Sequence, residues 1–196
     1  KDWSSRSYKE ILLKVPKVFE NTEENSVLKG DIFDSMKNIA VDFAYFDPPY
    51  GSNNEKMPPS RVRYASYYHV WATICKNDKP PVFGAALRRE DTSDRVAATV
   101  FEEFRKDNDG HFIAVKAIEK LIQNVNAKYV ALSYSSGGKA TAEELNDILN
   151  RHGKLIKTIE LDYKKNVMAD MKWTNEWLRD AEEPNREFIF LIDKQA

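Results

Sequence analysis

A strand-like run at residues 41–46 ends against two consecutive prolines, Pro48 and Pro49. The run reads Val-Asp-Phe-Ala-Tyr-Phe, and its aromatic and apolar residues favour a strand. Proline fixes its own φ, removes an amide donor, and forces the residue before it into an extended conformation. The strand therefore has to end at Asp47, and the chain leaves the sheet there.

Strands and helices alternate along the rest of the chain, which predicts an α/β fold built on a mostly parallel sheet. Thr141 and Glu144 form a capping-box pattern that begins one helix, and Gly153 stops it. The last two strands have no clear amphipathic helix between them, so we expect the C-terminal strand to be antiparallel. The further expected strands are residues 26–29, 129–134, 155–162 and 187–193, and the further expected helices or helical turns are residues 6–20, 33–38, 65–76, 94–106 and 111–125.

Length and composition are those of one globular domain. The 196 residues suit a single domain, residues 1–196, with inserted loops at residues 51–95 and 163–185. Neither the apolar content of 42% nor the charged content of 31% indicates long disorder. The net charge of -1 requires any nucleic-acid binding to come from a local patch.

Several classes of protein are disfavoured by single residue types. Cys75 is the only cysteine, which excludes an internal disulfide framework and fits a reducing cytoplasm. No apolar run approaches the roughly 20 residues of a membrane helix. His111 and His152 lack acidic or cysteine partners at ligand spacing, so we expect no metal site.

The segment after the 41–46 strand is suited to binding an amino group. In open α/β sheets, ligands bind at the carboxyl ends of the strands. The Asp47 carboxylate and the Pro48 carbonyl are acceptors held with no competing donors beside them. They would bind the two hydrogens of an amine on a flat ring, and Tyr50 would stack on that ring, a contact of about 1–3 kcal/mol. The alternative is that the four residues are only a turn.

Asp47-Pro48-Pro49-Tyr50 matches the catalytic motif of the amino-methyltransferases that modify adenine in DNA. The chain resembles most closely the adenine methyltransferases of restriction-modification systems. This resemblance implies an enzyme that moves a methyl group from S-adenosylmethionine to the 6-amino group of adenine. Asp47 and Pro48 would orient the amine, and Tyr50 would stack on a base flipped out of the duplex.

Other segments are also similar to that family. Gly30-Asp31 resembles the segment whose aspartate helps hold the cofactor, so Asp31 and Asp47 are the expected cofactor-binding residues. Residues 68–74, beginning with Tyr68, resemble the helix after the catalytic motif. Residues 132–138 resemble the strand and loop near the target base, which makes Ser133 and Tyr134 expected substrate-binding residues.

The family's glycine-rich cofactor turn is missing upstream of the catalytic motif, where Gly30 stands alone. The five expected strands correspond to the third through seventh of the family's seven-stranded Rossmann-like sheet, so the first two are missing. We therefore expect an N-terminal segment or a companion chain to supply them, and the absence of an initial methionine agrees with this.

Basic and aromatic residues are interleaved in residues 51–95, and Arg61 and Arg63 are the expected DNA contacts. A solvated loop of mixed charge is the alternative. Two other functions stay open, namely methylation of an amino group in RNA and a catalytically idle DNA-binding subunit.

Overall fold

The computed structural model describes residues 15–51, 63–93, 95–162 and 186–196. The chain divides into two units, Lys1–Gly30 and Asp31–Ala196. In the first unit, the described residues 15–30 form neither helix nor strand. The prediction of a helix at residues 6–20 is wrong for residues 15–20, and its first part lies outside the described residues.

The prediction of a strand at residues 26–29 is also wrong. Val27 is 97% exposed and Leu28 is 69% exposed, and no described segment pairs with them. A strand is stabilised by hydrogen bonds to a neighbouring strand and by packing of its side chains. The apolar composition of residues 26–29 supplies neither the hydrogen bonds nor the packing.

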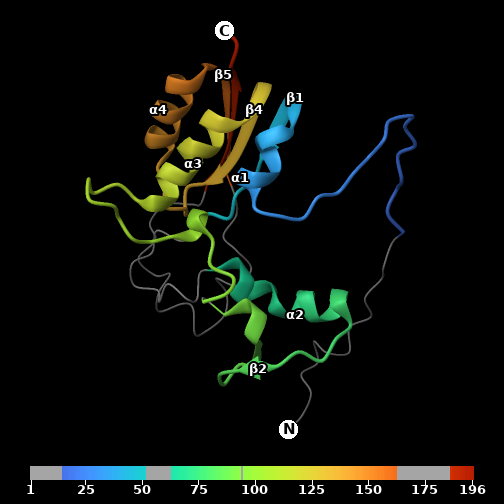
Figure 1. The fold of residues 1–196 in the computed structure, drawn as a ribbon. Coiled ribbons are helices and arrows are strands. Elements are labelled where there is room, and N and C mark those ends of the chain that lie inside the picture. The colour runs from blue at the N-terminus through green and yellow to red at the C-terminus, as the bar shows by residue number, and fades with distance from the viewer. Residues whose placement is uncertain (1–14, 52–62, 94, 163–185) are drawn as a thin grey trace. The chain divides into compact units, whose positions relative to one another are not determined.

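Four strands form the main sheet of the second unit (Figure 1), in the spatial order β1 (Ala40–Phe46), β4 (Asn126–Ser135), β6 (Arg186–Asp193) and β5 (Lys154–Asp162). β1 and β4 are parallel, while β6 pairs antiparallel with both β4 and β5. The expected antiparallel C-terminal strand is confirmed, and the other three strands share one direction. Among the described residues, β1 and β5 are the two edges of this sheet.

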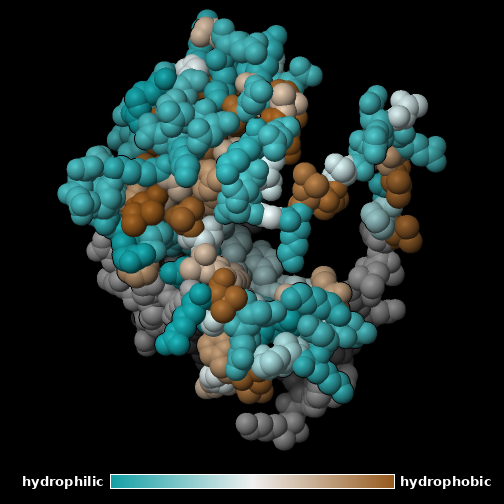
Figure 2. All heavy atoms as spheres, in the orientation of Figure 1, coloured by the Kyte–Doolittle hydropathy of each residue, from teal (hydrophilic) through white to brown (hydrophobic). Residues whose placement is uncertain are grey.

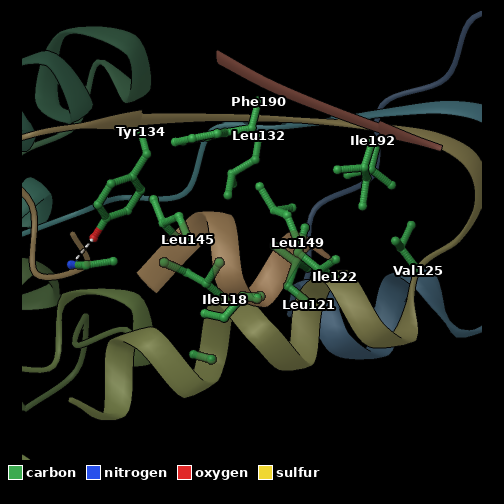
Figure 3. Packing of buried hydrophobic residues seen from close by; sticks show 14 of the residues in the cluster. Ile118, Leu121, Ile122, Val125, Leu132, Tyr134, Leu145, Leu149, Phe190 and Ile192 are labelled. Carbon is green, nitrogen blue, oxygen red and sulfur yellow. Dashed lines mark hydrogen bonds between the residues drawn. The ribbon is translucent and has the colours of Figure 1, made fainter. Parts of the chain in front are cut away.

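One face of the sheet is covered by helices. These are α1 (Ile32–Ser35) with the 3-10 turn η2 (Met36–Asn38), α3 (Ile113–Asn124) and α4 (Ala142–His152). Figure 1 shows α3 and α4 on the same side of the sheet, and Figure 2 shows a mostly hydrophilic outer surface over them. Figure 3 shows Ile118 of α3 and Leu145 of α4 pointing toward Leu132 of β4, and all three are buried.

The predicted start of α4 is confirmed. The Thr141 hydroxyl accepts a hydrogen bond from the Glu144 amide at 3.1 Å, and the Glu144 carboxylate accepts one from the Thr141 amide at 2.8 Å. Gly153 follows the helix, and a Cβ there would lie 2.6 Å from the Asp193 carbonyl oxygen. The helix can therefore return to the sheet only through a residue without a side chain.

The helix expected at residues 65–76 is confirmed as α2 (Tyr64–Lys76). The residues expected as a loop after it contain a short hairpin of β2 (Val82–Phe83) and β3 (Arg88–Arg89), followed by the 3-10 turn η4 (Glu90–Thr92). Arg89 is 3% exposed and donates to Asp78 and Asp91 at 2.9 and 2.8 Å and to Thr73 of α2 at 3.2 Å. This ion-pair cluster joins the hairpin to α2.

The prediction of a helix at residues 94–106 is wrong in the part that the structure describes. Only a single 3-10 turn forms there, η5 (Val100–Glu102). Phe101 packs into the core and stacks on Phe33 with 5.7 Å between ring centroids. Glu103 then takes an extended conformation and ends the turn. Packing against α1 has overridden the helical pattern of the sequence.

The second face of the sheet carries exposed apolar side chains. Val41, Phe43 and Tyr45 alternate along β1 with Ala44 and Phe46, which pack against the core. The three are 42%, 53% and 55% exposed. On the opposite edge strand, Ile159 and Leu161 are also exposed. No described helix covers these five side chains.

Within the described ranges, no helix is both long and apolar enough to cross a bilayer.

Candidate active site

The Asp-Pro-Pro-Tyr segment lies directly after β1, as the sequence predicted. The Asp47 side chain is exposed, Pro48 is buried, and Pro49 and Tyr50 are partly buried. Because β1 and β4 are parallel, their carboxyl ends lie at the same edge of the sheet. The chain therefore brings residues 47–50 beside the end of β4, where Ser133 and Tyr134 lie.

Tyr50 is packed between two other tyrosines. Its ring centroid is 5.3 Å from that of Tyr134 and 6.0 Å from that of Tyr64, the latter edge-on at 80°. Tyr68, one helical turn further along α2, stacks on Tyr64 at 5.8 Å and 7°. The catalytic loop is thus joined by aromatic contacts to both β4 and α2.

The same cluster perturbs the Tyr64 phenol. Burial raises the pKa of Tyr64 above its ordinary value, and a hydrogen bond with Tyr50 and the negative charge of Asp47 add to the increase. The hydrogen bond with Tyr50 joins the start of α2 to the catalytic loop. The sequence did not single out Tyr64 for this role, because only the fold brings it beside Tyr50.

Tyr134 is 1% exposed, and burial raises the pKa of its phenol to about 12. Its hydroxyl accepts hydrogen bonds from the amides of Lys139 and Ala140 at 3.1 and 3.2 Å, one of which is drawn in Figure 3. A Cβ on Gly138 would lie 2.5 Å from the Tyr134 ring. The loop after β4 can therefore close over the ring only with glycine at position 138.

Gly51 and Glu102 are further residues at this site that the sequence did not indicate. Gly51 follows the catalytic segment with a φ of 44°, in the left-handed region that favours glycine. A Cβ at Gly51 would lie 3.6 Å from the Cα of Glu102. Glu102 is 4% exposed, and its carboxylate accepts a hydrogen bond from the Tyr64 amide at 2.6 Å. A glycine directly after the motif was the one available sequence signal.

The other predicted site residues lie in varied surroundings. Asp31 caps α1, accepting from the Phe33 amide at 2.9 Å, and its side chain is exposed. Arg63, predicted to contact DNA, is only 7% exposed and precedes α2. Tyr68 is 55% exposed, and Ser133 is partly buried on β4. Arg61 lies outside the described residues.

The described residues contain no group of three or more His, Cys, Asp or Glu side chains arranged to hold a metal ion.

Comparison with known proteins gives several relatives. The chain is 27% identical over 149 residues to modification methylase StsI of Streptococcus sanguinis, covering 76% of this chain and 20% of that protein. It is 26% identical over 194 residues to type II methyltransferase M.FokI of Planomicrobium okeanokoites, covering 99% of this chain and 26% of that protein. It is 24% identical over 151 residues to type II methyltransferase M.NlaIII of Neisseria lactamica, covering 76% and 39%. The chain thus spans well under half the length of these relatives.

No solved structure matches the chain at a significant level. Residues 1–187 match the family of D12 class N6 adenine-specific DNA methyltransferases, which includes the whole catalytic segment and its surroundings. The match extends over nearly the entire chain and agrees with the Asp-Pro-Pro-Tyr segment at the end of β1. The chain therefore belongs to the D12 class of N6 adenine-specific DNA methyltransferases.

Proposed function

We propose that the whole protein transfers a methyl group from S-adenosylmethionine to the 6-amino group of adenine in DNA, as part of a restriction-modification system in the cytoplasm. The observation that carries this proposal is the position of Asp47-Pro48-Pro49-Tyr50 at the carboxyl end of β1. Membership of the D12 class and the similarity to modification methylases support the same reaction.

The residues of the catalytic loop would act on the amine. The conjugated amino group of adenine is a poor nucleophile. Asp47 and the Pro48 carbonyl would accept its two hydrogens and favour a pyramidal nitrogen whose lone pair points at the methyl group. The same acceptors would stabilise the positive charge that develops on nitrogen. The exposed Asp47 carboxylate is accessible for this role, and no covalent bond to the enzyme is needed.

The cofactor would supply the electrophilic methyl group. Asp31 and Asp47 are exposed carboxylates that fit the polar groups of S-adenosylmethionine. They are only part of a binding site, because residues 1–46 contain Gly30 and no second glycine for a glycine-rich turn. We infer that an N-terminal segment or a companion chain supplies that turn.

The sheet supports this inference. We propose that residues 1–196 are one catalytic domain with the insertions 51–95 and 163–185, and that its sheet is part of a Rossmann-like methyltransferase sheet. β1 pairs with β4 on one side, and no described strand pairs with its other side. The missing first two strands would pair there, and their helices would cover Val41, Phe43 and Tyr45, which are now exposed.

DNA would reach the site with the target base flipped out, since an amino group inside a duplex is inaccessible. Tyr50 would stack on the base. Tyr68, Ser133 and Tyr134 would line or support its surroundings, and Arg61 and Arg63 would contact the backbone. Arg63 would have to leave its buried position to do so.

The test uses the whole protein with labelled S-adenosylmethionine and unmethylated DNA, which is then digested to nucleosides. We expect label in N6-methyladenine. Asp47→Ala should lower kcat by at least about 100- to 1000-fold, the effect of removing one preorganised group from a transition state. Asp42→Ala, which removes an exposed carboxylate from β1, five residues before Asp47, is the matched control and should keep activity.

Other outcomes would redirect the proposal. Label in RNA and not in DNA would make the protein an RNA amino-methyltransferase. No transfer to either nucleic acid, with DNA binding retained, would make it an idle subunit. Equal losses in the Asp47 and Asp42 variants would remove the role of Asp47.

A further inference from the structure

Helix α2 begins without a cap of its own. Its N-cap residue, Arg63, makes no side-chain capping hydrogen bond. The first amides of a helix have no partner within the helix and carry a partial positive charge, so they favour a carboxylate. Glu102, 38 residues further along the chain, supplies one, accepting from the Tyr64 amide at 2.6 Å.

Glu102 lies on a firmly held support. It is the last residue of η5, and the residue before it, Phe101, is buried and stacked on Phe33. The Thr99 hydroxyl accepts from the Phe101 amide at 3.4 Å and begins the turn. Glu102 itself is 4% exposed. The carboxylate is therefore fixed relative to the core and can fix the start of α2 in turn.

The start of α2 touches the catalytic loop. Tyr64 is the first residue of the helix, and its ring meets Tyr50 edge-on at 6.0 Å. On the other side of the same loop, Gly51 approaches Glu102 so closely that a Cβ would lie 3.6 Å from the Glu102 Cα. Glu102 thus lies against both the end of the loop and the helix that packs on it.

We propose that Glu102 is a positioning residue for methyl transfer, which holds the start of α2 so that Tyr64 keeps Tyr50 in place beside the acceptors of the catalytic loop. This rests on the proposed function of the loop. Glu102 acts through Tyr64 and Tyr50.

The test compares Glu102→Ala with Glu102→Gln in the whole protein. The alanine variant loses the acceptor and should lower kcat by about 10- to 100-fold, the rate equivalent of a hydrogen bond to a charged group. Its KM for S-adenosylmethionine should change by less than about threefold, because the residue displaced is Tyr50, which stacks on the base and has no role in holding the cofactor. The amide oxygen of glutamine still accepts from Tyr64, so that variant should recover most of kcat.

A second measurement tests directly whether Glu102 stabilises the start of α2. Hydrogen exchange of the first-turn amides of α2 should accelerate in Glu102→Ala and much less in Glu102→Gln. Asp107→Ala is the matched control, because the Asp107 carboxylate also accepts backbone amides, from Asp109 at 2.9 Å and His111 at 3.1 Å, in the loop before α3. It should leave both kcat and the exchange of α2 unchanged.

Unchanged kcat in Glu102→Ala would overturn the proposal, and so would equal losses in all three variants. Loss of kcat without faster exchange at Tyr64 would show that the effect does not pass through α2, and would overturn it as well. If the wild-type protein transfers no methyl group to DNA, the proposed function fails. The exchange measurement then still decides whether Glu102 holds α2.

Discussion

Tyr134 connects the hydrophobic core to the catalytic loop. Its ring is buried against Gly138, and its hydroxyl accepts hydrogen bonds from two backbone amides. The ring also contacts the ring of Tyr50 in the catalytic loop. The sequence predicted Tyr134 as a substrate-binding residue. The structure gives it a supporting position on the core side of Tyr50, and its contact with a base stays a prediction.

Gly138→Ala should destabilise the fold by about 1–3 kcal/mol, the usual cost of overpacking a filled site. The new Cβ would lie 2.5 Å from the Tyr134 ring, so the ring or the loop must shift. Urea denaturation of the wild-type and variant proteins measures this. In a Tyr134→Leu background the added methyl group should cost less, because the ring is gone. Additive effects of the two substitutions would contradict the close packing.

The catalytic loop and its partners differ in how far the sequence could predict them. Asp47 to Tyr50 were predictable because proline acts on its immediate neighbours, whatever the rest of the chain does. Glu102 and Tyr64 were not, because their hydrogen bond spans 38 residues. Nothing local to either residue indicates the other.

At the scale of elements, local signals succeeded where the chain itself supplies the contacts. The predictions for α2 and α3 are confirmed, because the periodicity of apolar side chains lies within each helix. The predicted start of α4 is confirmed because its capping box is formed by residues of the same turn. The strand predicted at residues 26–29 is absent because a strand needs a neighbouring strand to pair with. The helix predicted at residues 94–106 is wrong in its described part, because the packing of Phe101 shapes η5 there. Amino-acid composition predicts neither the presence of a neighbouring strand nor the packing of a side chain against a distant helix.

The contact between α3 and α4 should depend on pH. Arg151 of α4 donates to Glu119 of α3 at 2.7 Å, and this hydrogen bond lowers the pKa of Glu119 below its ordinary 4.5. A carboxylate whose pKa is lowered by folding stabilises the fold fully at pH values above the pKa that it has in the unfolded chain. This contribution disappears as the pH falls through the pKa of the folded state.

Because Glu119 is partly exposed, we expect a contribution of at most about 1 kcal/mol. Denaturation of wild type and Glu119→Gln at pH 7 and pH 3 measures it, and the difference between the two proteins should be smaller at pH 3 than at pH 7. Asp147→Asn, an exposed position in the middle of α4, is the control and should show little difference at either pH. A difference that stays the same from pH 7 to pH 3 would contradict the ion pair.

At the scale of the whole molecule, the sheet is covered by described helices on one face only. We expect the second face to be covered in the whole protein, so Phe43→Asp should place an unpaired charge in an interface and lower stability by on the order of 3 kcal/mol. Val96→Asp is the control, since Val96 is 69% exposed outside the sheet. Thermal denaturation of the whole protein compares them. Equal, small effects would mean that Phe43 stays in contact with water.

No described strand pairs with the outer edge of β1, and this has a consequence for handling the protein. An uncovered strand with apolar side chains is a template for pairing with another chain. Residues 31–196 prepared by themselves would join edge to edge as their concentration rises, and salt would not dissolve such aggregates because main-chain hydrogen bonds hold them together. We therefore expect a partner on β1 to keep the preparation monodisperse, and light scattering then measures whether that edge is paired.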